Sequence, residues 1–115
     1  MSIKLSCIKE LAGTIINARS KHVNVVKLKS LIHYMREYSC CIDLQLFGVR
    51  ILSSVLNTEN GLCVIEGIFI ELREHFDEIT RWNVAVDEVR VFWSLVEKKR
   101  GNIAEVLSGL KTKNV

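Results

Sequence analysis

The chain has 115 residues, of which 49% are hydrophobic and 25% are charged. This composition is typical of a single globular domain with a packed core, and it excludes a disordered polar chain. The apolar runs are far shorter than the roughly 20 residues that cross a bilayer, and the first residues lack a secretory signal. We therefore expect an intracellular protein, cytoplasmic or nuclear, without a membrane span.

The first half of the chain predicts three helices, because its apolar residues recur at steps of three and four. The first predicted helix covers residues 3–18, and the second covers residues 25–35 and ends at a polar stop near Ser39. The third covers residues 44–56, with Asp43 in its first turn, where a negative charge suits the helix dipole.

A second run of helices follows the polar segment Asn-Thr-Glu-Asn-Gly at residues 57–61. The apolar positions from Leu62 to Phe76 keep the helical spacing, but Gly67 lies among them. This pattern predicts a short helix and a longer helix that meet at a bend.

The last third of the chain predicts two more helices. Asn83 is a suitable N-cap for the first of them, which is expected to stop at the cations Lys98, Lys99 and Arg100 followed by Gly101. A separate short helix is then expected over residues 103–110.

The sequence offers no pattern for a metal, a cofactor or a catalytic centre. The four cysteines lack a CxxC spacing and do not lie near the histidines, so we expect reduced thiols, no disulfides and no zinc. No phosphate loop, nucleophile elbow or HExxH motif occurs, and the acidic residues Glu71, Glu74, Asp77 and Glu78 have the spacing of a solvated helix face. We expect no enzymatic activity.

The net charge of +3 divides into alternating bands. Residues 1–39 carry seven basic and two acidic residues, residues 40–79 carry two and seven, and residues 80–115 carry seven and four. Such bands can steer a partner or favour self-association, although a solvated helix face is the commoner explanation of any single run.

An internal repeat is indicated by a shift of 40 residues, which aligns the apolar positions of three segments: Leu11-Ala12-Ile15, Ile51-Leu52-Val55 and Val91-Phe92-Leu95. A period near 40 with helices in every unit is the size of an armadillo or HEAT array, in which each unit packs on its neighbours. The alternative is a compact helical bundle whose helices have similar spacing.

Two segments resemble armadillo repeats more closely. Residues 60–76, Asn-Gly-Leu-Cys-Val-Ile-Glu-Gly-Ile-Phe-Ile-Glu-Leu-Arg-Glu-His-Phe, look like the first and second helices of one repeat, and residues 43–56 look like a third helix, with Gly48 at a position that is usually small. The resemblance implies an all-α, short right-handed solenoid. Residues 1–115 would form one domain with full units at 22–57 and 58–98 and partial units at both ends.

The family's third helices line a concave groove, where a tryptophan and, four residues on, an asparagine hold an extended peptide. By position the tryptophan corresponds to Glu10, Arg50 and Arg90, and the asparagine corresponds to Thr14, Ser54 and Ser94. Because neither signature residue is present, the usual clamp for basic peptides is not expected.

The candidate partner-binding residues are therefore Arg50, Ser54, Arg90 and Ser94. Two arginines one repeat apart would favour an acidic segment, since guanidinium groups pair well with carboxylates. The alternative interpretation is that both arginines are solvated or bonded to neighbouring acids.

The leading functional hypothesis is a non-catalytic module that binds another protein through a helical-repeat surface. One alternative is nucleic-acid binding through the basic N-terminal third, with Lys4, Lys9, Arg19, Lys21, Lys27 and Lys29 against phosphates. The modest total charge and the acidic middle argue against it. Another is a self-assembling structural protein, because uncovered end helices of a short array favour a homo-oligomer.

Overall fold

The computed structural model describes residues 10, 13, 15, 16 and 22–113 of the chain. Within this part there are five helices: α2 (Val25–Glu37), α3 (Ile42–Val55), α4 (Gly61–Gly67), α5 (Phe69–Arg81) and α6 (Val86–Lys113). No strand occurs in the described residues, where β pairing is limited to an isolated bridge between Ile16 and Val23. The predicted all-helical class is confirmed, and the helix predicted over residues 3–18 lies largely outside the described residues.

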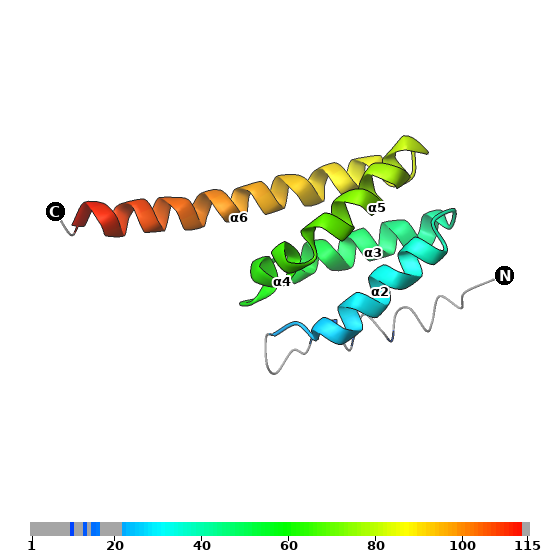
Figure 1. Cartoon of the computed structure of the whole chain (residues 1–115), viewed down its shortest axis with the longest axis horizontal. Coiled ribbons are helices and arrows are strands. Elements are labelled where there is room, and N and C mark those ends of the chain that lie inside the picture. The colour runs from blue at the N-terminus through cyan, green and yellow to red at the C-terminus, as the bar shows by residue number, and fades with distance from the viewer. Residues whose placement is uncertain (1–9, 11–12, 14, 17–21, 114–115) are drawn as a thin grey trace.

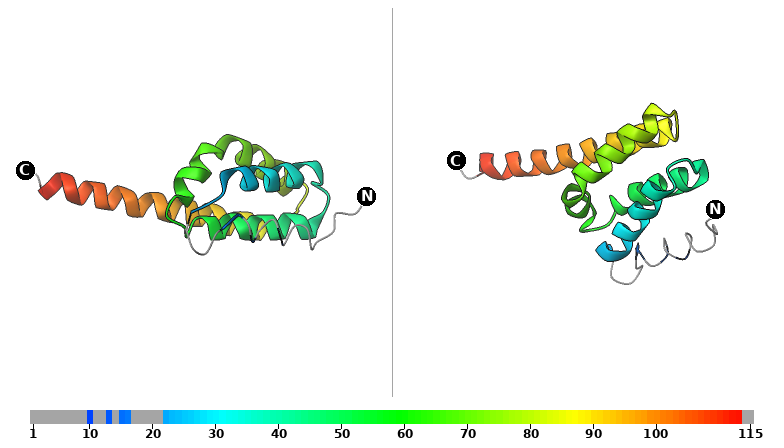
Figure 2. Two further views of the ribbon diagram at one scale, coloured as in Figure 1. Left: turned by 90° about the horizontal axis from the view of Figure 1, so that it is seen from below. Right: turned by 45° about the vertical axis from the view of Figure 1, so that its right-hand side comes forward.

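The four long helices form two layers (Figures 1 and 2). α2 and α5 lie in one layer and run in the same direction. α3 and α6 lie in the other layer and run in the opposite direction, while α4 joins α3 to α5 at one end. α3 contacts α2, α4 and α6, so it is the central helix of the described part.

The helix pair α2 and α3 is followed by a similar pair, α5 and α6, 44 residues further along the chain. α2 and α5 are both 13 residues long and begin at Val25 and Phe69, and α3 and α6 begin at Ile42 and Val86. The observed spacing exceeds the 40-residue shift found in the sequence by four residues, which is about one helical turn. A shift of one turn keeps the same apolar face, so the sequence pattern is similar at both spacings.

The core lies between the layers and is mainly aliphatic, with an aromatic cluster at one end. Phe76 of α5 and Phe92 of α6 are fully buried and meet edge to face, with 5.4 Å between ring centroids. Trp93 adds a partly buried ring 5.7 Å from Phe76. The fully buried aliphatic residues include Ile15 and, from α2 to α5, Leu28, Leu31, Leu44, Leu52, Ile65, Leu72 and Ile79. Because each contributes about 1.5–3 kcal/mol when buried, they provide most of the stabilisation.

Two glycines permit close approaches between segments. A Cβ at Gly48 of α3 would overlap the end of the Met35 side chain on α2, so a larger residue here would require that flexible side chain to move. A Cβ at Gly61 would overlap the backbone carbonyl of Val55, which the loop brings back against the start of α4. Position 48, where a small residue is expected, therefore lies against the side chain of Met35.

The predicted interruptions in the middle of the chain are confirmed. α3 ends at Val55 and α4 begins at Gly61, so the polar segment 57–61 separates two helices. α4 ends at Gly67 and α5 begins at Phe69, so the bend lies at the predicted glycine.

The predicted end at Gly101 is wrong, because α6 continues without a break from Val86 to Lys113. Gly101 is helical and does not adopt a positive φ, so it does not cap the helix. A glycine inside a helix costs only about 1 kcal/mol relative to alanine, and the apolar period continues across it. The separate helix predicted over residues 103–110 is therefore the second half of α6.

The predicted N-cap at Asn83 is also wrong. Asn83 and Ala85 have φ values of 58° and 54°, in the left-handed region, and α6 begins at Val86. Asparagine tolerates this conformation better than most residues. Asn83 thus forms the tight turn between α5 and α6 instead of capping the helix.

Candidate functional site

The second half of α6 projects beyond the rest of the described structure. Val89, Phe92 and Val96 in the first half are buried against the other helices. Beyond Arg100, no other described helix lies beside α6, which extends outward to Lys113 (Figures 1 and 2). Ile103, the first large apolar residue of this projecting part, is 50% exposed.

The projecting half carries an apolar stripe, which we call the free stripe: positions Ile103, Val106, Leu107 and Leu110. At 3.6 residues per turn, these positions fall on the same face of α6 as Phe92 and Val96. By helical position, the face that forms the core in the first half of α6 therefore continues into the half beside which no other described helix lies.

A polar and aromatic contact fixes α6 at the point where the free stripe begins. Arg100 Nε donates to Glu66 Oε1 of α4 over 3.0 Å, and the guanidinium carbon lies 5.0 Å from the centroid of the Phe69 ring. Phe69 in turn packs edge to face on Trp93, with 5.4 Å between centroids. Cation–π and ion-pair contacts of this kind hold α6 to both α4 and α5.

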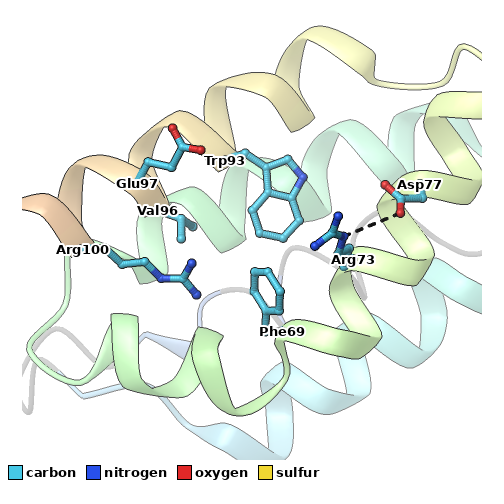
Figure 3. A pocket seen from close by; sticks show the side chains of 7 residues that line it. All are labelled: Phe69, Arg73, Asp77, Trp93, Val96, Glu97 and Arg100. Atoms are coloured by element: carbon cyan, nitrogen blue, oxygen red, sulfur yellow. Dashed lines mark ion pairs between the residues drawn. The ribbon is translucent and has the colours of Figure 1, made fainter.

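Beside this contact, α5 and α6 enclose a shallow groove of about 480 Å³ (Figure 3). Phe69, Trp93 and Val96 form its apolar floor. Two cations and two acids complete the lining, namely Arg73, Arg100, Asp77 and Glu97, and the Arg73–Asp77 pair is 4.0 Å apart. The charges balance, and the lining residues include no histidine, cysteine or serine to act as a base or nucleophile. The groove can accept an apolar side chain, but its residues suggest no reaction.

Two of the predicted binding residues, Arg50 and Ser54, lie on α3. Arg50 Nη2 is 3.1 Å from Glu88 Oε1 of α6, which gives an ion pair between the two helices. Ser54 is exposed, and its hydroxyl donates to the Arg50 carbonyl over 3.1 Å, within its own helix. The geometry therefore favours the interpretation in which Arg50 is bonded to a neighbouring acid.

The other two predicted residues, Arg90 and Ser94, are exposed on α6. Arg90 Nη1 is 3.9 Å from Asp87 Oδ1, one turn earlier in the helix. With Glu88 beside Arg50 and Asp87 beside Arg90, the local charges on this surface cancel. An acidic segment would therefore compete with two carboxylates already present.

A buried polar contact joins α2, α3 and α5, and the sequence does not predict it. Gln45 is fully buried, and its Nε2 donates to the carbonyls of Met35 over 2.8 Å and Tyr38 over 3.1 Å. Its Oε1 lies 2.8 Å from Nε2 of His75, which is 1% exposed. Because an amide oxygen only accepts, the ring proton is on His75 Nε2.

His75 is held in its neutral form. Burial lowers its pKa below the usual value, the Arg36 cation lowers it further, and the Glu78 carboxylate opposes this in part. The second ring nitrogen, Nδ1, is buried without a hydrogen-bond partner, so a proton there would be a buried, unpaired charge. Periodicity places His75 on the inner face of α5, but its partner Gln45 is 30 residues away and is not visible from the sequence.

Neither metal-binding nor membrane-spanning features occur in the described part of the chain. No group of three or more histidine, cysteine, aspartate or glutamate side chains is arranged to hold an ion there. Cys40, Cys41 and Cys63 are exposed free thiols. None of the helices that the structure describes combines the length and the apolar character needed to cross a membrane.

Comparison with protein families, curated proteins and solved structures found no match to this chain.

Proposed function

We propose that this chain is a non-catalytic protein-interaction module, built as a short right-handed solenoid of armadillo-like repeats, and that it binds its partner through the free stripe on α6. The observation that carries the proposal is that the face of α6 buried in its first half continues, by helical position, into a half beside which no other described helix lies. Large apolar faces on protein surfaces mark interaction sites.

The arrangement of helices supports the repeat interpretation. α4, α5 and α6 follow one another as a short helix and two longer ones, similar to the three helices of an armadillo unit. The 44-residue spacing lies within the range of about 40–47 residues for armadillo and HEAT units. In such arrays each unit covers the exposed face of the preceding one, so the free stripe is the surface that a further helix would cover.

The energetics indicate that burial of the free stripe alone would not be enough for stable binding. Four aliphatic side chains contribute about 6–12 kcal/mol when fully buried. Association costs about 4–15 kcal/mol in lost translational and rotational freedom. The two terms are of the same order, so the partner is expected to contact neighbouring surfaces of α4 and α6 as well.

The non-catalytic part of the proposal is supported by the state of the titratable groups. Within the described residues, His75 is the group whose pKa is clearly shifted, and it is closed off from solvent by Gln45 and the core. A catalytic base must reach its substrate, whereas this histidine serves packing.

The proposal is tested with Leu107→Asp, which places a charge in the free stripe. The matched control is Ser108→Asp, which adds the same charge one residue further on, away from the stripe. Proteins crosslinked to the wild-type chain in its source cell are identified by quantitative mass spectrometry, and binding is then measured between purified components. We expect a partner that the wild type and Ser108→Asp retain and Leu107→Asp loses, with an affinity change of at least about tenfold.

Circular dichroism establishes that both variants are folded. Equal retention of every captured protein by Leu107→Asp and Ser108→Asp would contradict the proposal.

A further inference from the structure

The turn between α2 and α3 carries two adjacent cysteines. Cys40 and Cys41 are both exposed, and both thiols are free. Free cysteine is among the residues that proteins bury most often, where it packs as a small apolar group. Packing therefore does not account for a pair that lies in solvent, and the reactivity of the two thiols is the property to consider.

The side chain and the backbone of Cys41 differ in how the fold uses them. Cys41 is the N-cap residue of α3, but its side chain makes no capping hydrogen bond. Its backbone N–H donates to the Tyr38 carbonyl over 3.0 Å, and its carbonyl accepts from the backbone N–H of Gln45 over 3.1 Å. A reaction at the thiol thus takes place on a segment whose backbone is part of the fold.

This turn is connected to the buried contact between α2, α3 and α5. The Tyr38 carbonyl that accepts from Cys41 also accepts from Nε2 of Gln45, over 3.1 Å. Gln45 in turn holds Nε2 of His75 through its Oε1, over 2.8 Å. A change in the peptide between Cys40 and Cys41 therefore reaches the buried contact through one shared carbonyl.

A disulfide between adjacent residues is strained. Consecutive Cα atoms lie about 3.8 Å apart across a trans peptide, whereas a disulfide usually joins Cα atoms about 4.4–6.8 Å apart. The ring that such a bond closes contains the peptide between the two cysteines, so this peptide must twist. Strained, exposed disulfides are readily reduced. A bond between Cys40 and Cys41 would therefore open and close with the redox conditions.

We propose that Cys40 and Cys41 are a reversible redox site, which a small disulfide such as glutathione disulfide oxidises, and that the resulting bond loosens the contact of Gln45 with Tyr38. One cysteine thiolate attacks a sulfur of glutathione disulfide, which forms a mixed disulfide and releases one glutathione. The other thiolate attacks the cysteine sulfur of the mixed disulfide and releases the second glutathione. The two thiols lose two electrons and two protons, which end on the two glutathione molecules.

The redox site is separate from the free stripe. Figure 1 shows the turn between α2 and α3 at the opposite end of the molecule from α4 and the projecting half of α6. The test therefore needs no binding partner, and its result does not depend on the proposed function.

The sequence isolates the two cysteines in one tryptic peptide. Trypsin cleaves after Arg36 and Arg50, and residues 37–50 contain Cys40, Cys41 and no other cysteine. The reduced full chain is treated with glutathione disulfide without denaturant, blocked with N-ethylmaleimide and digested. We expect this peptide to carry no maleimide and to be two hydrogens lighter than its reduced form. Dithiothreitol should restore the reduced mass.

Cys63 provides an internal comparison in the same digest. It is exposed, and it lies in the separate tryptic peptide of residues 51–73, which contains no second cysteine. This peptide should therefore carry either maleimide or one glutathione, and it should not lose two hydrogens.

Two matched variants separate the pair from a single reactive thiol. Cys40→Ser leaves Cys41 without a neighbouring thiol, so the mixed disulfide should persist and residues 37–50 should retain one glutathione. Cys63→Ser removes an exposed thiol elsewhere and should leave formation of the Cys40–Cys41 bond unchanged. Circular dichroism establishes that both variants are folded.

Hydrogen exchange measures the effect on the buried contact. The double variant Cys7→Ser with Cys63→Ser keeps Cys40 and Cys41 as its only cysteines. Oxidation should speed exchange at the start of α3 about fivefold, the effect of roughly one net hydrogen bond. Exchange in the first half of α6 should stay unchanged.

Several outcomes would overturn the inference. Maleimide on both cysteines, a glutathione adduct that persists in the wild type, or a bond from either cysteine to Cys7, Cys63 or a second chain would reject the redox site. A Cys40–Cys41 disulfide with unchanged exchange at the start of α3 would reject its effect on Gln45.

Discussion

His75 occupies a site that accepts only its neutral form. Its Nε2 donates a hydrogen bond to Gln45 Oε1, and its Nδ1 is buried without a hydrogen-bond partner. Gln45 in turn uses both amide hydrogens on carbonyls at the end of α2 and in the turn after it. The contact thus ties three helices together, while leaving no acceptor for a second proton on the ring.

Stability is therefore expected to fall with acidification. Burial lowers the pKa of His75 below the usual value of 6.5, so between the two values the unfolded chain binds a proton that the folded chain does not. The stabilisation is fully present above pH 6.5 and is lost as the pH falls toward the lowered pKa. Urea unfolding at about pH 7.5 and about pH 5 measures this loss.

The matched variant for this prediction is His75→Gln, which cannot titrate but can still donate an amide hydrogen to Gln45. Its stability should change less between the two pH values than that of the wild type. His22 and His33 are exposed and present in both proteins, so their contributions cancel. An equal loss in both proteins would show that other groups cause the acid sensitivity.

At the scale of the helix, the continuity of α6 decides whether the proposed binding surface exists. The cations at residues 98–100 followed by Gly101 favour an end of the helix there. The apolar residues Val96, Ile103 and Leu107 nevertheless keep the helical spacing across Gly101, so they fall on one face of α6. A helix that ended there would leave residues 103–110 free to turn away. The unbroken helix instead fixes the free stripe relative to the core.

Gly101→Pro tests this continuity. Inside a helix, proline costs about 3 kcal/mol, so residues 101–113 should unwind locally while the two layers remain folded. Hydrogen exchange should lose protection in this segment alone, with a matching loss of helical dichroism. Gly101→Ala, the control, should increase protection by up to about 1 kcal/mol. A proline variant with unchanged exchange would mean that α6 ends near Gly101 in solution.

The sequence predicts helices better than it predicts contacts between them. The helical period and the turn residues predict the interruptions between helices at residues 57–61 and Gly67, because these signals depend only on residues close together in the sequence. Arg50 is exposed, but its partner Glu88 is 38 residues away in the sequence. Arg100 and Glu66, which mark the start of the free stripe, are 34 residues apart. Pairings of this kind depend on how the helices pack against one another, and local sequence patterns do not reveal that packing.

At the scale of the whole molecule, some charges of the alternating bands pair with one another between helices. Arg36 of the basic first band lies 3.7 Å from Glu74 of the acidic second band. Arg100 of the third band pairs with Glu66 of the second, and Arg50 pairs with Glu88. These pairs are exposed, so each contributes little stability, about 1 kcal/mol at most. They nevertheless favour one arrangement of the helices over others.

The double variant Arg50→Glu with Arg90→Glu tests which surface binds the partner. If binding occurs at the free stripe, the affinity for the captured partner should stay within about twofold of the wild type, and stability should fall by less than about 2 kcal/mol. Calorimetry with purified components measures both. Abolished binding in a folded variant would instead favour the acidic-segment hypothesis for Arg50, Ser54, Arg90 and Ser94.

The projecting half of α6 also gives the molecule a gradient of local stability. Beyond Arg100 no other described helix lies beside α6, so we expect this part of the helix to open at lower free energy than the two layers. Unwinding from Lys113 inward meets its first barrier at the Arg100–Glu66 contact. We therefore expect a protease that cleaves within residues 101–113 to remove the proposed binding surface and leave the two layers folded.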